Sequence, residues 1–235
     1  MLSGILQKRF LAIGLIVLGL LGVGLLWYLV LGQGLGTSEQ RVYTADDFPN
    51  VGSVIQDPTV IAERIAYLNQ WYDEIYNDSE ADVAFNYNRI GVVKKTLQDY
   101  VGAEQAWLKA LELNKSSLNW ANLASLYYLE LGQPQKAIDY FTQAILVNPN
   151  NPPFYEDLAG VYRYKLGNDS QKVEEVMLYA TTNDPFSANN YYLYLLEYYE
   201  SDGQNQEKFD HYLELLLDND PSELQLQNLR QNGWL

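Results

Sequence analysis

Few residues of this chain are of the types that carry out catalysis or bind metal ions. The sequence contains no cysteine and a single histidine, His211. This composition excludes disulfides, thiol catalysis, thiolate metal sites and any centre that needs two histidines. His211 follows Asp210 and lies near Glu214 in an expected helix, where a lone histidine is typical of a solvated surface. We therefore expect no catalytic residue and no enzyme activity.

An acidic cluster formed by Asp78, Glu80 and Asp82 has the carboxylate density of a calcium-binding loop. Such a loop needs a glycine at its sixth position and a bidentate glutamate at its twelfth. Neither condition is met, because Val83 and Arg89 occupy those positions. The cluster is better explained as a turn between helices that supplies an N-cap. We expect no metal site and no cofactor.

The net charge of the whole chain is −15, and all of its acidic residues lie after residue 9. Lys8 and Arg9 precede all 30 acidic residues, which leaves −17 on the rest of the chain. Such a surface repels phosphate backbones and anionic head groups, so nucleic acid is not expected as a partner. The simplest explanation of the charge is solubility.

Residues 10–31 form a continuous run without charge, and nearly all of them are apolar. As a helix this run would span about 33 Å, close to the hydrocarbon thickness of a bilayer. Lys8 and Arg9 precede the run, and the first basic residue after it is Arg41. The positive-inside bias therefore places the tail, residues 1–9, in the cytoplasm and everything after the run on the other side.

The rival interpretation of this run is a cleaved signal peptide. The run is long for a signal peptide, and only residues 34–36 resemble a cleavage site, so we expect an uncleaved anchor. The protein would then be a single-pass membrane protein that contacts the lipid bilayer through residues 10–31. Its folded part would be periplasmic or extracellular in a bacterium. Residues 32–57 mix Gly, Ser, Asp and Asn without periodicity, which predicts a flexible linker.

Prolines recur at a fixed spacing in the second half of the chain. Pro149, Pro185 and Pro221 are separated by 36 residues, and each follows Asn or Asp. A shared pattern starts twelve residues before each proline, and a further copy starts at Ala103 with Lys115 in place of the proline. A period of this length indicates a stacked-repeat protein.

Each copy is expected to contain two antiparallel helices, because its apolar residues recur at spacings of three and four. Gly132, Gly167 and Gly203 lie where the first helix must end, since glycine tolerates the left-handed conformation of a helix C-cap. Proline cannot continue a helix and therefore stops the second one. The four copies are expected at residues 84–117, 118–151, 152–187 and 188–221.

The best-preserved copy carries a recognisable set of residues: Leu123, Ala124, Tyr127, Gly132, Ala137, Phe141, Ala144 and Pro149. This pattern resembles the tetratricopeptide repeat, and residues 83–221 contain about four versions of it. The resemblance implies an all-α fold, an α-solenoid of about four helix-turn-helix units, here preceded by one transmembrane helix. It also implies a protein or peptide partner and no small-molecule substrate. The alternative is a helical hairpin array of another type.

Helices are also expected on both sides of the repeats. Pro58 follows an aspartate and can begin a flanking helix within residues 58–82, whose apolar residues recur at spacings of four and three. The segment 222–235 is predicted to form a polar capping helix, with Leu224 and Leu229 facing the last repeat.

In tetratricopeptide proteins the first helix of each unit lines a concave groove that binds partners. The residues offset from the core leucines on these helices are Asn88, Val92, Lys95, Asn122, Ser125, Tyr128, Glu156, Arg163, Tyr194 and Glu197. Tyrosine and arginine are favoured anchors in interfaces, although buried tyrosines can instead fill the packing between helices. The carboxylate clamp of the family is not expected, because Asn88 and Val92 stand where its lysine and asparagine should be.

These patterns predict a membrane-anchored scaffold that binds a partner protein or peptide in the groove, near the outer side of the membrane. The alternative is a structural subunit or assembly factor of a membrane protein complex. In that case the transmembrane helix and the convex faces would make the contacts.

Overall fold

The computed structural model describes residues 41–80 and 82–235, and Tyr43–Leu235 form one compact unit. The part of the chain that is described is entirely helical and contains no strand. The predicted tail at 1–9 and anchor at 10–31 lie outside the described residues. None of the helices within the described ranges has both the length and the apolar character that a membrane crossing requires.

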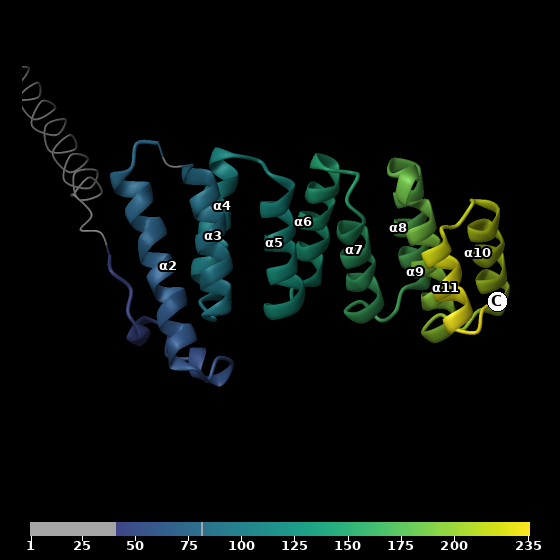
Figure 1. Cartoon of the computed structure of the whole chain (residues 1–235), viewed down its shortest axis with the longest axis horizontal. Helices are drawn as coiled ribbons and strands as arrows, with labels where there is room; N and C mark the ends of the chain where they lie inside the picture. The colour runs from purple at the N-terminus through teal and green to yellow at the C-terminus, as the bar shows by residue number, and fades with distance from the viewer. Residues whose placement is uncertain (1–40, 81) are drawn as a thin grey trace, which may run out of the picture. The chain divides into compact units, whose positions relative to one another are not determined.

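The helices follow one another in series, and from α2 to α10 each packs against the next along the chain (Figure 1). Their bounds are α2 Pro58–Asn77, α3 Val83–Thr96, α4 Tyr100–Leu113, α5 Ser117–Ser125, α6 Pro134–Val147, α7 Pro152–Tyr164, α8 Ser170–Asn183, α9 Ala188–Ser201, α10 Gln206–Asp218 and α11 Glu223–Gln231. A π-helical turn, η3 Leu126–Glu130, continues α5. The pairs α3–α4, α5–α6, α7–α8 and α9–α10 are the expected helix-turn-helix units, so the prediction of an all-α solenoid is confirmed.

The three periodic prolines lie directly after the ends of second helices. The helices α6 and α8 end two residues before Pro149 and Pro185, and α10 ends three residues before Pro221. Proline disfavours the helical conformation of the residue before it, which accounts for these boundaries.

Every unit turns between its two helices through a residue with a left-handed backbone. Gly132 and Gly167 have φ values of 60° and 78°, as predicted. The prediction for Gly203 is wrong, because Gln204 adopts the positive φ of 42° there. Gly203 is needed for space instead, since a Cβ at this position would lie 2.6 Å from the ring of Tyr199.

The residues that carry the repeat pattern form the core. Ala124, Ala137, Phe141 and Ala144 are completely buried, as are their counterparts in the third unit. The first unit follows the same scheme, with Ala103, Trp107 and Ala110 buried, and the indole of Trp107 packs where a side chain at position 91 would otherwise extend.

The flexible linker predicted over residues 32–57 is wrong for the part from Tyr43 onward. The segment forms two short 3-10 turns, η1 Ala45–Asp47 and η2 Val51–Ser53. Phe48 and Val51 are buried in one cluster with apolar residues of α2 and α3. The backbone of Tyr43 exchanges two hydrogen bonds with the side chain of Asn69, at 2.7 and 2.9 Å. A few buried apolar side chains and these hydrogen bonds hold the segment against the helices, although its apolar residues form no periodic pattern.

The terminal helix α11 begins with a capping box formed by Ser222 and Gln225. Leu229 is fully buried, but Leu224 is 76% exposed, so its predicted inward orientation is wrong. Leu226 packs against the core in its place, because it lies one turn before Leu229 on the same face.

Candidate partner-binding surface

A cavity of about 700 Å³ is lined by residues of α2, α3, α4 and α5 and by neighbouring segments. We call it the first cavity, and its lining consists of Val54, Ile55, Val60, Arg64, Val92, Lys95, Thr96, Gln98, Tyr100, Trp107, Asn122, Ser125 and Glu130. Four predicted groove residues meet here, because α3 contributes Val92 and Lys95 while α5 contributes Asn122 and Ser125.

The charged side chains of the first cavity are two cations and one anion. Lys95 Nζ lies 3.6 Å from Glu130 Oε1, and both side chains are partly exposed. Arg64 forms no ion pair with any residue in the described ranges. The cavity therefore offers positive charge to an incoming group.

Asn88, a predicted groove residue, does not line this cavity. It is buried, and its side-chain amide donates a hydrogen bond to Asn119 Oδ1 of the next unit. Its backbone carbonyl accepts a hydrogen bond from Trp107 Nε1 at 3.2 Å. Asn88 therefore joins the first two units and is not free to bind a partner. Nearby Lys94 is likewise buried and pairs with Asp99 at 2.8 Å.

A second cavity, of about 340 Å³, lies between α7, α9 and α11. Its lining consists of Glu156, Asn190, Leu193, Tyr194, Glu197, Glu200, Asn228, Asn232 and Trp234. Three predicted groove residues are among them, namely Glu156, Tyr194 and Glu197. Trp234 Nε1 donates a hydrogen bond to Glu200 Oε1 at 2.8 Å, which ties the chain end to α9.

The second cavity is electrostatically opposite to the first. Within the described ranges, no lysine or arginine pairs with Glu156 or Glu197. Burial, followed by the charges of Asp157 and Glu197, raises the pKa of the Glu156 carboxyl. Burial also raises the pKa of Tyr194 to about 12, against the opposing effect of Arg163.

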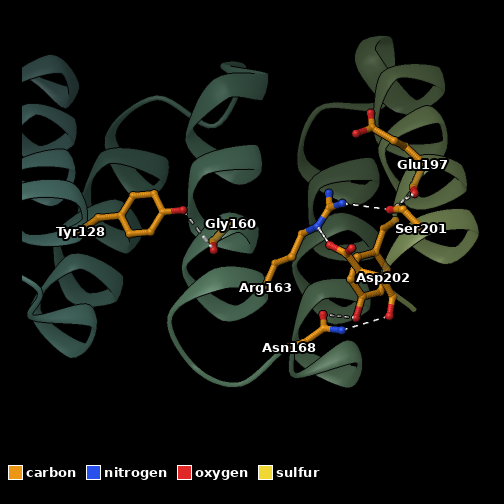
Figure 2. A network of polar contacts seen from close by, with 8 residues as sticks. Tyr128, Gly160, Arg163, Asn168, Glu197, Ser201 and Asp202 are labelled. Atoms are coloured by element: carbon orange, nitrogen blue, oxygen red, sulfur yellow. Dashed lines mark hydrogen bonds and ion pairs between the residues drawn. The ribbon is translucent and has the colours of Figure 1, made fainter. Parts of the chain in front are cut away.

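The other two predicted anchors, Tyr128 and Arg163, lie outside both cavities and bond within the chain. Figure 2 shows that the Tyr128 hydroxyl approaches the Gly160 carbonyl, to which it donates a hydrogen bond of 3.3 Å. Arg163 forms an ion pair with Asp202 and donates a 3.1 Å hydrogen bond to Ser201 Oγ. These contacts connect η3 to α7 and α7 to α9, so both residues hold successive units together.

Sequence reasoning missed the lining residues that lie outside the repeats. Val60 and Arg64 come from α2, and Val54 and Ile55 from the segment before it. One available signal was that Val60 and Arg64 are four residues apart and border the apolar stripe of α2. No comparable signal marks Trp234, which follows the last helix.

The residues considered for catalysis and for metal binding lie at the surface or cap a helix. His211 is exposed, and its ring lies 5.1 Å from that of Tyr212. Asp82 accepts a hydrogen bond of 3.0 Å from the Phe85 amide and caps α3, as expected. No group of three His, Asp or Glu side chains in the described ranges is placed to hold a metal ion.

A further groove of about 380 Å³ lies among α6, α7 and α8. Its second-helix contributions are mostly apolar, from Ile145, Leu146, Val176 and Tyr179, and the ion pair of Lys172 with Glu175 borders it. This groove exposes apolar side chains of the second helices α6 and α8.

Comparison with known proteins identifies one of the four units directly. Residues 120–151, which span most of α5 and all of α6, match the family model described as Tetratricopeptide repeat. No curated protein matches the chain. Among solved structures, the crystal structure of MamA is 18% identical, with a TM-score of 0.51 over 69% of this chain and 91% of that one. PilF of Pseudomonas aeruginosa is also 18% identical, with a TM-score of 0.47 over 80% and 82% of the two chains. The similarity to MamA concerns the fold alone.

Proposed function

We propose that the chain is a membrane-anchored scaffold that binds a segment of a partner protein on the first-helix surface. We define this surface as the linings of the first and second cavities. One observation carries the proposal: seven of the ten predicted groove residues line these two cavities, and all seven come from α3, α5, α7 and α9.

The dimensions and chemistry of the surface support peptide binding. Both cavity volumes lie in the range of about 300–1,000 Å³ that is typical of ligand sites. The first cavity combines aliphatic walls with amide and hydroxyl groups, and the second includes the aromatic side chains of Tyr194 and Trp234 in its lining. Side chains of a bound segment could fill the cavities while its backbone bonds to the amide and hydroxyl groups that line them.

The membrane part of the proposal rests on residues 10–31 of the sequence and on the charge bias around them. Because the chain packs from Tyr43 onward, only residues 32–42 remain to connect the anchor to the repeats. Eleven residues reach at most about 40 Å when fully extended. The repeats would therefore bind their partner close to the non-cytoplasmic surface of the membrane.

Site-specific photo-crosslinking in membranes tests where the partner binds. A photoreactive residue at Val92 or at Glu197 should capture the same partner, because one segment would occupy both cavities. The matched control is a photoreactive residue at Leu108, which is exposed on the second helix α4. Capture from Leu108 that equals capture from Val92 would contradict the proposal.

The second candidate is a structural subunit or assembly factor of a membrane complex. The apolar groove among α6, α7 and α8 favours it, because a contact surface on the second helices is what this function needs. Crosslinking from Tyr179, combined with loss of the partner when residues 10–31 are replaced by an unrelated apolar helix, would establish this function over the first.

A further inference from the structure

We infer that the first cavity binds a partner segment in which an apolar side chain lies next to a carboxylate. The inference rests on the proposed function, which it makes specific by naming the chemistry of the occupant. It follows from the walls of the cavity, from its charges and from the contrast with the second cavity.

The walls select an apolar side chain. Ile55 and Val60 approach from the N-terminal side, Val92 from α3, and Trp107 from α4. Val92 is 44% exposed although it lies in the middle of a helix. A side chain that covered it would remove apolar surface of both partners from water, which is the main favourable contribution in most protein associations.

The charges select an anion. Arg64 forms no ion pair within the described ranges, and the only acidic residue of the lining is Glu130. The 3.6 Å separation of Lys95 from Glu130 exceeds the roughly 2.7–2.9 Å of a strong charged hydrogen bond. A carboxylate of the partner could therefore pair with Arg64 and compete for Lys95 at low cost.

The positive charge of this cavity is local. It occurs in a chain that carries −17 after its first nine residues, and the second cavity is acidic. A carboxylate would be repelled from Glu156 and Glu197, so the two cavities would orient an extended segment in one direction. Because Arg64 belongs to the flanking helix α2, this site differs from a clamp built within the repeats.

Binding of designed peptides to the full chain in detergent micelles tests the inference. Four short fluorescent peptides share a leucine-containing core and differ only in charge. One has internal glutamates and an amidated end, and one has glutamines and a free C-terminal carboxylate. The other two are amidated and carry glutamines or lysines. Their dissociation constants are measured by fluorescence anisotropy.

We expect a carboxylate peptide to bind about tenfold more tightly than the neutral peptide. The better of the first two peptides identifies the source of the carboxylate, a side chain or a chain end. Arg64→Gln and Lys95→Gln should each remove most of this preference. Lys109→Gln removes the same charge from exposed α4 and should leave it unchanged. Circular dichroism verifies that the variants are folded.

The design separates two kinds of failure. The net charge of the protein favours the lysine peptide, so equal or tighter binding of that peptide overturns the inference. The inference is also overturned if Arg64→Gln reduces the preference for the carboxylate peptide no more than Lys109→Gln does. In both cases neutral peptides that still bind leave the proposed function intact. Absence of any binding tighter than about 1 mM contradicts both.

Discussion

At the scale of single residues, Trp107 and Gly91 depend on each other in the core of the first unit. Its side chain is 1% exposed, donates a hydrogen bond to the Asn88 carbonyl and forms part of the first cavity. The indole has room only because position 91 is glycine, since a Cβ there would lie 2.5 Å from Trp107 Nε1. Gly91 therefore allows both the packing of α3 on α4 and the position of Trp107 in the cavity lining.

Gly91→Ala should lower the free energy of unfolding by up to about 2 kcal/mol. The clash with Trp107 costs about 1–3 kcal/mol as overpacking, and the higher helix propensity of alanine offsets about 1 kcal/mol. Urea denaturation measures the effect. Gly52→Ala is the control, because nothing lies within 4 Å of a Cβ at that position. Equal stability of the two variants would show that Trp107 adapts without cost.

At the scale of elements, the turns between paired helices explain how units of unequal length keep the same packing. Tyr127 and Gly132 are five residues apart, whereas Tyr199 and Gly203 are four apart. In the second unit the longer spacing is accommodated by the π-helical turn η3, whose last residue, Glu130, lines the first cavity. The third unit has the same spacing, from Tyr162 to Gly167, without such a turn. Single π-helical turns often mark functional sites.

Substitutions of the left-handed turn residues should change the stability in opposite directions in two of the units. Gln98 has a φ of 62°, so Gln98→Gly should raise the free energy of unfolding by about 0.5–1 kcal/mol. Gly132→Ala should lower it by about 1 kcal/mol, because alanine is strained at a φ of 60°. Thermal unfolding measures both changes. Two shifts of the same sign would mean that the backbone conformations of these turns are not equivalent.

An acidic residue joins the third unit to the fourth. Glu174 on α8 accepts a hydrogen bond from Lys208 Nζ at 2.6 Å and another from the Tyr212 hydroxyl, both on α10. Burial opposes the charge of Glu174, but these bonds outweigh it and lower the pKa of the carboxyl. The contribution to stability is therefore complete above the unfolded pKa of about 4.3 and is lost as the pH falls through the lower folded pKa.

Glu174→Gln should lower the free energy of unfolding at pH 7 by about 1 kcal/mol, a modest value because solvent screens this partly exposed group. The difference between variant and parent should shrink as the pH falls below about 4, where the parent carboxyl becomes protonated. Urea unfolding at several pH values measures this convergence. A constant difference down to pH 3 would contradict the assigned cause.

At the scale of the whole molecule, the helices at the two ends of the repeat array cover the terminal units and contribute to the cavity linings. The C-terminal helix α11 covers the last unit with Leu229 and presents polar residues outward, as a solenoid end requires. The N-terminal helix α2 also packs on its neighbouring unit, yet it supplies Arg64 and Val60 to the first cavity. The flanking helices thus complete the two cavities of the first-helix surface.

The orientation expected from the charge bias concerns the entire chain. A reporter enzyme that is active only outside the cytoplasm, fused after Leu235, should be active in cells. The matched control exchanges the charges around residues 10–31, with glutamines at Lys8 and Arg9 and added lysines after Gly32, which should reverse the result. Activity of a cytoplasmic reporter on the unaltered chain would exclude the proposed topology.

The pairing of helices could be predicted because its causes are local in the chain. The spacing of apolar residues defines the buried face of each helix, and the prolines after α6, α8 and α10 define where helices end. The segment from Tyr43 to Asp57 was beyond such reasoning, since Phe48 and Val51 are buried by contacts with helices that follow them. Local composition does not contain that information.

The sequence by itself therefore determined the repeat architecture and the helices that carry the candidate surface. Only the tertiary structure decided which of their residues remain free. Asn88 and Arg163 have the types expected of binding residues, but partners 31 and 39 positions away occupy their polar groups. Arg64 has no such partner in the described ranges and joins Asn122 in one cavity. The physical reason is that a hydrogen-bonding group is committed by what lies near it in space, which the periodicity of a helix does not specify.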